Sequence, residues 1–214
     1  MQRTANLLLF MILFLFFNLH FIDSPSSSTI ESLESKVKVY EKFMEYREIS
    51  RREKVEETMY DSLMKKSSIK WLLTGFVKTQ IHMESSGNQG AISPEGAIGI
   101  AQFMPNTWEG LIQRGMLPTW FDINNEKHQR IAQLVYLDHL YGMWWKFPDD
   151  RRALTAASYN AGPGRILNLI KVYGLYWREY LPKETTNYLK HLKIYVHYDN
   201  SNSIQNGSSS RSGS

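Results

Sequence analysis

One stretch, residues 81–108, constrains this chain more than any other. Large side chains recur at helical spacing in the residues that lead into it, which predicts a helix with one face against a core. The helix is predicted to run from about Ser67 to Ser86, because glycine commonly follows a helix end and Gly87 stands there. Glu84 therefore falls in the last turn, at the negative end of the helix dipole, where the charged form of a carboxyl group is disfavoured.

The residues after this helix end are suited to contact with another molecule. Gly96 and Gly99 allow the backbone to approach a neighbouring group closely. Gln102 follows, with a neutral side chain that both donates and accepts hydrogen bonds. A carboxylic acid beside such residues indicates a site that protonates a neutral leaving group. On position alone, however, a glutamate like Glu84 is more often a solvated surface residue, so the surrounding motifs have to decide.

Those motifs stand in a specific order along the chain. They are Glu84-Ser85, then Ser93-Pro94-x-Gly96-Ala97-x-Gly99-x-x-Gln102-x-Met104-Pro105, then Ala156-x-x-Tyr159-Asn160-Ala161-Gly162. Together they resemble the lytic transglycosylase family, over roughly residues 66–198. Members of that family have a goose-lysozyme-like catalytic domain and cut the glycan strands of bacterial peptidoglycan. The resemblance therefore implies an all-α, lysozyme-like fold and peptidoglycan as the partner.

The resemblance also implies a reaction and a set of site residues. A single glutamate, Glu84 here, would act first as acid and then as base on the β-1,4 bond between MurNAc and GlcNAc. The C6 hydroxyl of the sugar would be the nucleophile, so the product would be a 1,6-anhydro-muramyl end formed without water. Tyr159 would direct its hydroxyl at Glu84, and Ser93 would form hydrogen bonds nearby. The substrate-binding residues implied in this way are Ser93, Gln102, Met104, Tyr159, Asn160 and Glu184.

Two other functions stay open. A goose-type lysozyme would hydrolyse the same bond, but it needs a second carboxylate to activate water. Glu95 is the nearest acid in the motif region, and we expect it to be solvated. A peptidoglycan-binding scaffold without activity is the other alternative, which the intact Glu84, Gln102 and Tyr159 disfavour. An acid at this site needs its pKa raised to about 6–7, and burial would supply most of that shift.

The first 23 residues have the character of a targeting segment. Arg3 precedes an apolar run at residues 7–17, as in a signal peptide, but no Ala-x-Ala cleavage site follows. The segment is therefore a cleaved signal peptide or an N-terminal anchor, and an uncleaved form would hold the protein in the cytoplasmic membrane through residues 5–22. Either form places the rest of the chain outside the cytoplasm, in the periplasm or cell envelope.

Residues 24–65 are predicted to form a short linker and one or two charged amphipathic helices. Apolar residues from Ile30 to Met44 follow heptad spacing for only about two heptads, which is too short to predict a coiled coil or an oligomeric state. The catalytic domain would then occupy residues 66–198, and residues 199–214 are a polar tail predicted to be disordered.

Composition excludes some further chemistry. The chain has no cysteine, so the exported domain has to fold without disulfides and without a lipid-bearing cysteine. Its six histidines show no metal-ligand spacing, and no phosphate-binding or nucleic-acid motif is present. We therefore expect no metal, no cofactor and no nucleic-acid partner. Residues 66–198 hold 15 Lys and Arg against 10 Asp and Glu, an excess too small to predict a partner.

Overall fold

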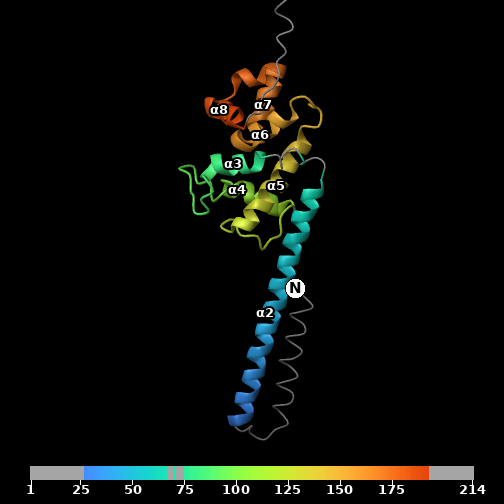
Figure 1. Ribbon diagram of the computed structural model, residues 1–214, viewed down its shortest axis with the longest axis vertical. Helices are drawn as coiled ribbons and strands as arrows, with labels where there is room; N and C mark the ends of the chain where they lie inside the picture. Colours follow the sequence, from blue (N-terminus) through green and yellow to red (C-terminus); the bar gives the residue numbers. More distant parts are fainter. Residues whose placement is uncertain (1–26, 67–69, 71–74, 193–214) are drawn as a thin grey trace, which may run out of the picture. The chain divides into compact units, whose positions relative to one another are not determined.

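The computed structural model describes residues 27–66, 70 and 75–192 (Figure 1). Within these residues the regular structure is helical, and extended pairing is limited to two isolated bridges, Ile92 with Ile98 and Ile98 with Phe103. The predicted all-α class is confirmed. The predicted targeting segment and polar tail lie outside the described residues. The helices are α2 (Ser27–Lys65), α3 (Phe76–Ser85), α4 (Pro105–Gln113), α5 (Glu126–Met143), α6 (Arg151–Ala161), α7 (Pro163–Tyr173), the 3-10 helix η2 (Gly174–Tyr180) and α8 (Lys183–His191).

The segment predicted to precede the catalytic domain is one continuous helix, α2. Apolar side chains are exposed both within the predicted heptad row and outside it: Ile30 of the row is 43% exposed, and Val39 and Phe43, which lie off the row, are 70% and 54% exposed. Arg51 and Arg52 pair with Glu48 at 3.1 and 3.2 Å, as residues three and four apart on a helix can. Among the described residues, no helix combines the length and apolarity needed to cross a bilayer.

The chain forms two compact units that divide between Val55 and Glu56, earlier than the predicted boundary at residue 66. The last part of α2 belongs to the second unit. There Leu63 is buried in the core, and the Glu56 carboxylate contacts Nε2 of His128 at 3.0 Å. Helix α2 runs continuously through this division.

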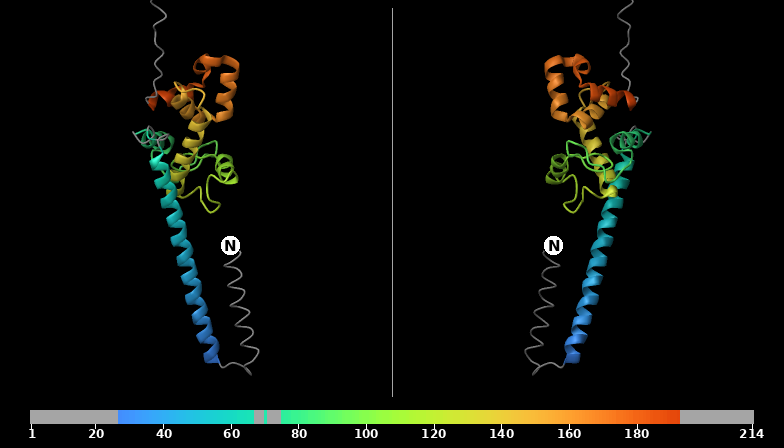
Figure 2. Two further views of the ribbon diagram at one scale, coloured as in Figure 1. Left: turned by 90° about the vertical axis from the view of Figure 1, so that its right-hand side faces the viewer. Right: turned by 90° about the vertical axis from the view of Figure 1, so that its left-hand side faces the viewer.

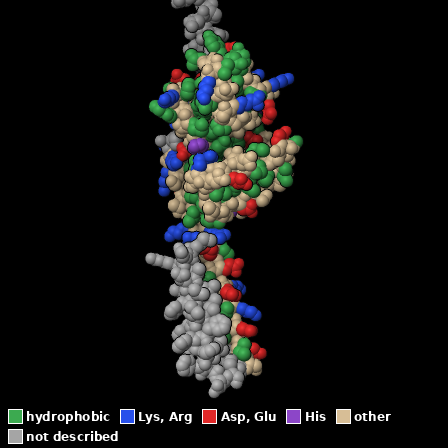
Figure 3. Space-filling view, turned by 180° about the vertical axis from the view of Figure 1, so that it is seen from behind, with side chains coloured by type: hydrophobic (Ala, Val, Ile, Leu, Met, Phe, Trp, Pro, Cys, Tyr) green, Lys and Arg blue, Asp and Glu red, His purple; other side chains and the backbone are tan. Residues whose placement is uncertain are grey.

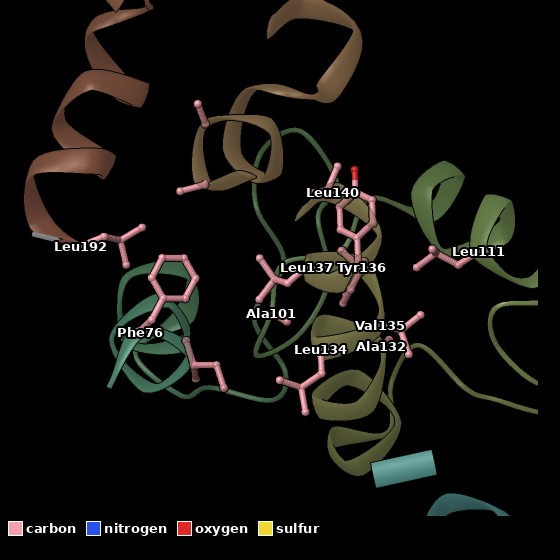
Figure 4. Packing of buried hydrophobic residues seen from close by; sticks show 14 of the residues in the cluster. Phe76, Ala101, Leu111, Ala132, Leu134, Val135, Tyr136, Leu137, Leu140 and Leu192 are labelled. Carbon is pink, nitrogen blue, oxygen red and sulfur yellow. The ribbon is translucent and has the colours of Figure 1, made fainter. Parts of the chain in front are cut away.

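Helix α5 is the centre of the second unit. The side chain of Asn125 caps its start by accepting a hydrogen bond from the N–H of His128. The helix buries side chains on opposite sides, with Leu134 and Leu137 toward α3 and Tyr136 toward α4 (Figure 4). A helix that is apolar on most of its circumference has to be surrounded by other elements.

Helix α6 links the central helix to the C-terminal helices of this unit. Helix α6 packs against α5, α7 and α8, and α7 continues into η2 (Figure 2). Trp144 is buried after the end of α5 and donates to the hydroxyl of Ser158, whereas Trp145 is 64% exposed. On the face in Figure 3, basic, acidic and hydrophobic side chains are interspersed, so the small positive excess forms no continuous patch on that face.

Helix α4 begins at Pro105, because the fixed φ of proline suits the first helical position. The final described helix, α8, ends at His191.

Candidate active site

Glu84 lies in the last turn of α3, one residue before the helix ends. The chain leaves the helix through two left-handed residues, Ser86 with φ 55° and Gly87 with φ 79°. The N–H of Ser86 donates to the carbonyl of His82 and closes the last turn. The predicted helix end is confirmed. The helix begins at Phe76; residues 67–69 and 71–74, where an earlier start was expected, lie outside the described residues.

The surroundings of Glu84 raise the pKa of its carboxyl group from 4.5 to about 7. Burial is the largest cause, a hydrogen bond from Tyr188 acts in the opposite direction, and the negative charge of Glu184 adds to the rise. A group with a pKa near 7 is present in both forms at neutral pH. Glu84 is therefore able both to donate a proton and to take one back.

The hydroxyl that reaches Glu84 belongs to Tyr188 of α8, which donates to Oε1 at 2.7 Å. Tyr159 was expected in this role, and its hydroxyl instead donates to the carbonyl of Ala101 at 2.8 Å. The ring of Tyr159 packs against Phe103 and Tyr136, and that position directs its hydroxyl toward the backbone. Tyr159 still lies near enough for the charge of Glu84 to raise its pKa, after the larger effect of burial.

Two buried glutamines connect to the same tyrosine. Gln80 donates to the hydroxyl oxygen of Tyr188 at 2.8 Å, and Gln133 of α5 donates to Oε1 of Gln80 at 2.8 Å. Both glutamines have no exposed side-chain surface. The sequence carried a signal for Gln80, a polar residue on the otherwise apolar face of the predicted helix. Nothing in the local pattern pointed to Gln133 as its partner.

The loop of residues 91–104, named the site loop here, forms the second part of the site. The N–H of Ala101 donates to Oε1 of Gln129, a buried residue of α5. Gly99 has φ 75°, and a Cβ on it would lie 1.8 Å from Nε2 of Gln129, so only glycine fits there. Ser85 ties the loop to α3 by donating to the carbonyl of Ile100 at 2.9 Å.

Ser93 serves the site loop itself. Its hydroxyl oxygen accepts hydrogen bonds from the N–H groups of Glu95 and Ala97. The structure therefore gives it a turn-forming role, and no described hydrogen bond joins it to Glu84. Glu95 is exposed, as expected.

Four of the predicted substrate residues line one cleft of about 260 Å³. Gln102 adopts φ 48°, and its amide donates to the carbonyl of Gly99 at 2.8 Å, which fixes the side chain at the edge of the site loop. Glu184 does not line this cleft, but it contacts the amide of Asn160 at 3.5 Å. The cleft is lined by Gln102, Phe103, Met104, Thr107, Tyr136, Tyr159, Asn160, Ala161, Gly162 and Pro163.

An all-helical domain in which the carboxyl group of Glu84 is partly buried near Tyr159, a residue of the cleft, fits one class, the lysozyme-like fold. Within that class the chain belongs to the transglycosylase SLT domain family, whose model matches residues 63–175. The matched segment contains Glu84, the site loop and Tyr159, and it ends before α8, which carries Glu184 and Tyr188.

Known proteins support this assignment. The chain is similar to the soluble lytic murein transglycosylases of Escherichia coli K12 and of Escherichia coli O157:H7, each 27% identical over 150 residues. The match covers 65% of this chain and 22% of each relative, so the chain spans about a fifth of their length. The crystal structure of the 70 kDa soluble lytic transglycosylase from Escherichia coli matches with a TM-score of 0.50 at 23% identity, covering 62% of this chain and 22% of that chain. This likeness supports the fold.

Proposed function

We propose that this protein is a peptidoglycan lytic transglycosylase that cleaves the β-1,4 bond between MurNAc and GlcNAc and leaves 1,6-anhydro-muramyl ends. One observation carries the proposal: in a transglycosylase SLT domain, the single motif glutamate, Glu84, is partly buried and has a pKa of about 7. A glutamate with the ordinary pKa of 4.5 would be protonated only about once in 300 molecules at pH 7, whereas Glu84 is protonated about half of the time.

In the first step, protonated Glu84 transfers its proton to the bridging oxygen. The bond between that oxygen and C1 of MurNAc breaks, the GlcNAc side leaves as a neutral alcohol, and positive charge develops at C1. Glu84 is then a carboxylate. The hydrogen bond that Tyr188 donates to Oε1 stabilises this charged form, so it opposes the effect of burial.

In the second step the same carboxylate acts as base. It takes the proton of the C6 hydroxyl of MurNAc while O6 attacks C1, which closes the 1,6-anhydro ring and regenerates protonated Glu84. No water is consumed. A group of intermediate pKa suits both steps, because a stronger acid would be a poorer base in the second.

The cleft lined by Gln102, Met104, Tyr159 and Asn160 is proposed to bind the glycan. Met104 is 40% exposed there and offers an apolar surface to a sugar ring. Asn160 is held by the hydroxyl of Thr185, which donates to its side-chain oxygen at 2.7 Å, and by Glu184. Glu184 is thus proposed to orient this wall, and Ser93 to shape the site loop.

A specific observation keeps hydrolysis as a second candidate. Glu184 lies near enough to Glu84 to raise its pKa, so a second carboxylate is present that could activate a water molecule. Mass spectrometry of peptidoglycan digested with the protein separates the two reactions, because the anhydro product is one water lighter than the hydrolytic product. We expect the anhydro product, absent in Glu84→Gln. A product with a free reducing end would establish the lysozyme reaction instead.

We also propose a location in the cell envelope, because peptidoglycan lies outside the cytoplasmic membrane and residues 1–23 have the pattern of a signal peptide or anchor. Cell fractionation combined with mass analysis of the mature N-terminus tests this. Membrane-bound protein with an intact N-terminus indicates an anchor, and a start near residue 24 indicates a cleaved signal. Intact protein in the cytoplasm would contradict the proposal.

A further inference from the structure

Three consecutive hydrogen bonds run from the central helix α5 to the carboxyl group of Glu84. Gln133 donates to Gln80, Gln80 donates to the Tyr188 hydroxyl, and that hydroxyl donates to Oε1 of Glu84, at 2.8, 2.8 and 2.7 Å. The linked residues come from α5, α3 and α8, and both glutamines are fully buried. We call Gln133, Gln80 and Tyr188 the amide chain.

The direction of the amide chain follows from the charge at its end. A carboxylate only accepts hydrogen bonds, so ionised Glu84 requires the Tyr188 hydroxyl to donate its one proton toward Oε1. The hydroxyl oxygen then faces Gln80 as an acceptor, so Gln80 has to present its NH₂ group. The carbonyl oxygen of Gln80 in turn faces Gln133, which has to present its own NH₂ group. Every link is complementary to the charged form of Glu84.

The stability of the core does not explain why Gln80 and Gln133 are polar residues. Oε1 of Gln133 is buried and has no hydrogen-bond partner among the described residues. A buried polar atom left unpaired costs about 1–3 kcal/mol, and leucine would fill a similar volume without that cost. Amides at such positions therefore indicate a requirement other than packing.

We propose that Gln80 and Gln133 are positioning residues for the reaction of Glu84, acting through Tyr188, whose hydroxyl they hold as a donor to Oε1. This rests on the proposed function, in which Glu84 is the acid and base. With Oε1 occupied by Tyr188, the transferable proton of Glu84 is carried by Oε2. The amide chain thus assigns one oxygen of the carboxyl group to the tyrosine and leaves the other for the substrate.

Other titratable groups around Glu84 do not replace this interaction. Tyr188 and Glu184 face it from α8, and Tyr159 approaches it from α6 with its hydroxyl on the carbonyl of Ala101. Glu184 acts by charge and raises the pKa of Glu84. Among these groups, the structure records a hydrogen bond to Glu84 from Tyr188.

The test compares Gln80→Leu, Tyr188→Phe and the double variant. The titration of Glu84 is followed by ¹³C NMR of the glutamate carboxyl groups, without substrate. Gln80→Leu should raise the pH at which Glu84 titrates, because Gln80 no longer polarises the Tyr188 hydroxyl or holds it as a donor to Glu84. On peptidoglycan, kcat should fall about tenfold with little change in KM. The double variant should be no slower than Tyr188→Phe alone, since Gln80 acts only through that hydroxyl.

Thr155→Val is the matched control. It also removes a buried hydrogen bond, from Thr155 to the carbonyl of Arg151, but it has no link to the amide chain. It should leave the Glu84 titration and kcat unchanged. If Gln80→Leu does not fold, Gln80→Leu with Gln133→Leu removes both amides together, which preserves packing better than leaving one unpaired.

The outcomes separate the two proposals. An unshifted Glu84 titration in folded Gln80→Leu, or losses of kcat that multiply in the double variant, would overturn the role of the amide chain. The NMR titration needs no catalysis. A shifted titration in a protein that does not cleave peptidoglycan would therefore support the amide chain and contradict the proposed function.

Discussion

Glu84 stands between two parts of the molecule that are held in different ways. The amide chain joins it to α5 and α8 through side-chain hydrogen bonds among Gln133, Gln80 and Tyr188. The site loop is held to α3 and α5 largely through its backbone, which binds Ser85 and Gln129. Two tyrosines show the difference: the buried Tyr188 donates to the carboxylate, and Tyr159, which lines the cleft, donates to a backbone carbonyl. The comparison teaches that the first part adjusts the chemistry of Glu84, whereas the second sets the shape of the cleft.

The largest effect is expected from replacing Glu84, the residue that stands between the two parts. Glu84→Gln should abolish cleavage, because the amide keeps the shape of the side chain but cannot donate a proton and retrieve it. Folding and glycan binding should persist. Turnover of peptidoglycan and binding to isolated glycan strands measure the two properties. Activity within tenfold of the wild type would contradict the single-acid mechanism.

The same variant should be more stable than the wild type above pH 7. The folded-state pKa of Glu84, about 7, lies above the unfolded value of 4.5, so folding opposes ionisation. The resulting loss of stability is absent below about pH 4.5, grows as the pH rises to about 7, and reaches about 3 kcal/mol. Thermal unfolding of both proteins from pH 4 to pH 8 checks this. A difference that is independent of pH would show that burial does not control Glu84.

The two tyrosines should respond differently to loss of the hydroxyl. Tyr188→Phe should lower kcat about 10- to 100-fold, the range for a positioned group next to proton transfer. It should also raise the pKa of Glu84, so that activity persists to higher pH, because Glu84 has to be protonated for the first step. Tyr159→Phe should leave that upper pH limit in place and should lower stability by about 1 kcal/mol through the lost bond to Ala101. Measuring the rate of each variant against pH tests this difference. The reverse pattern would mean that Tyr159, not Tyr188, donates to Glu84 during the reaction.

The packing of the site loop against α5 should require glycine at position 99. Gly99→Ala would put a methyl group into Gln129 at a left-handed backbone position, which should cost about 2 kcal/mol in unfolding free energy. Gly96→Ala serves as a matched control, because it also has positive φ, 86°, but nothing lies within 4 Å of its added Cβ. Chemical denaturation of both variants measures the difference, and equal losses would mean that backbone strain alone is at work.

The smallest effect should come from charge. Glu184→Gln should lower the pKa of Glu84 because a nearby negative charge is removed, so the upper pH limit of activity should move down. The shift should be smaller than that of Tyr188→Phe and in the opposite direction, since charge follows burial and the hydrogen bond as a cause. Complete loss of activity would instead support the hydrolytic candidate, with Glu184 activating water.

The sequence by itself determined features that depend on neighbouring residues. The end of α3 at Ser86 and Gly87, and with it the place of Glu84, follows from local backbone preferences. The family and the all-α class that it implies follow from the motifs, the last of which ends at Gly162. Each of these signals is a short segment of the chain, in which residue spacing translates directly into position in space.

Only the tertiary structure decided which hydroxyl reaches Glu84. Tyr188 is 104 residues away from it, and Gln80 and Gln133 are 53 residues apart. Local preferences place a tyrosine on a helix, but its partner depends on how α3, α5 and α8 pack. The raised pKa of Glu84 arises in the same way, because burial, its largest cause, exists only after those helices have assembled around the carboxyl group.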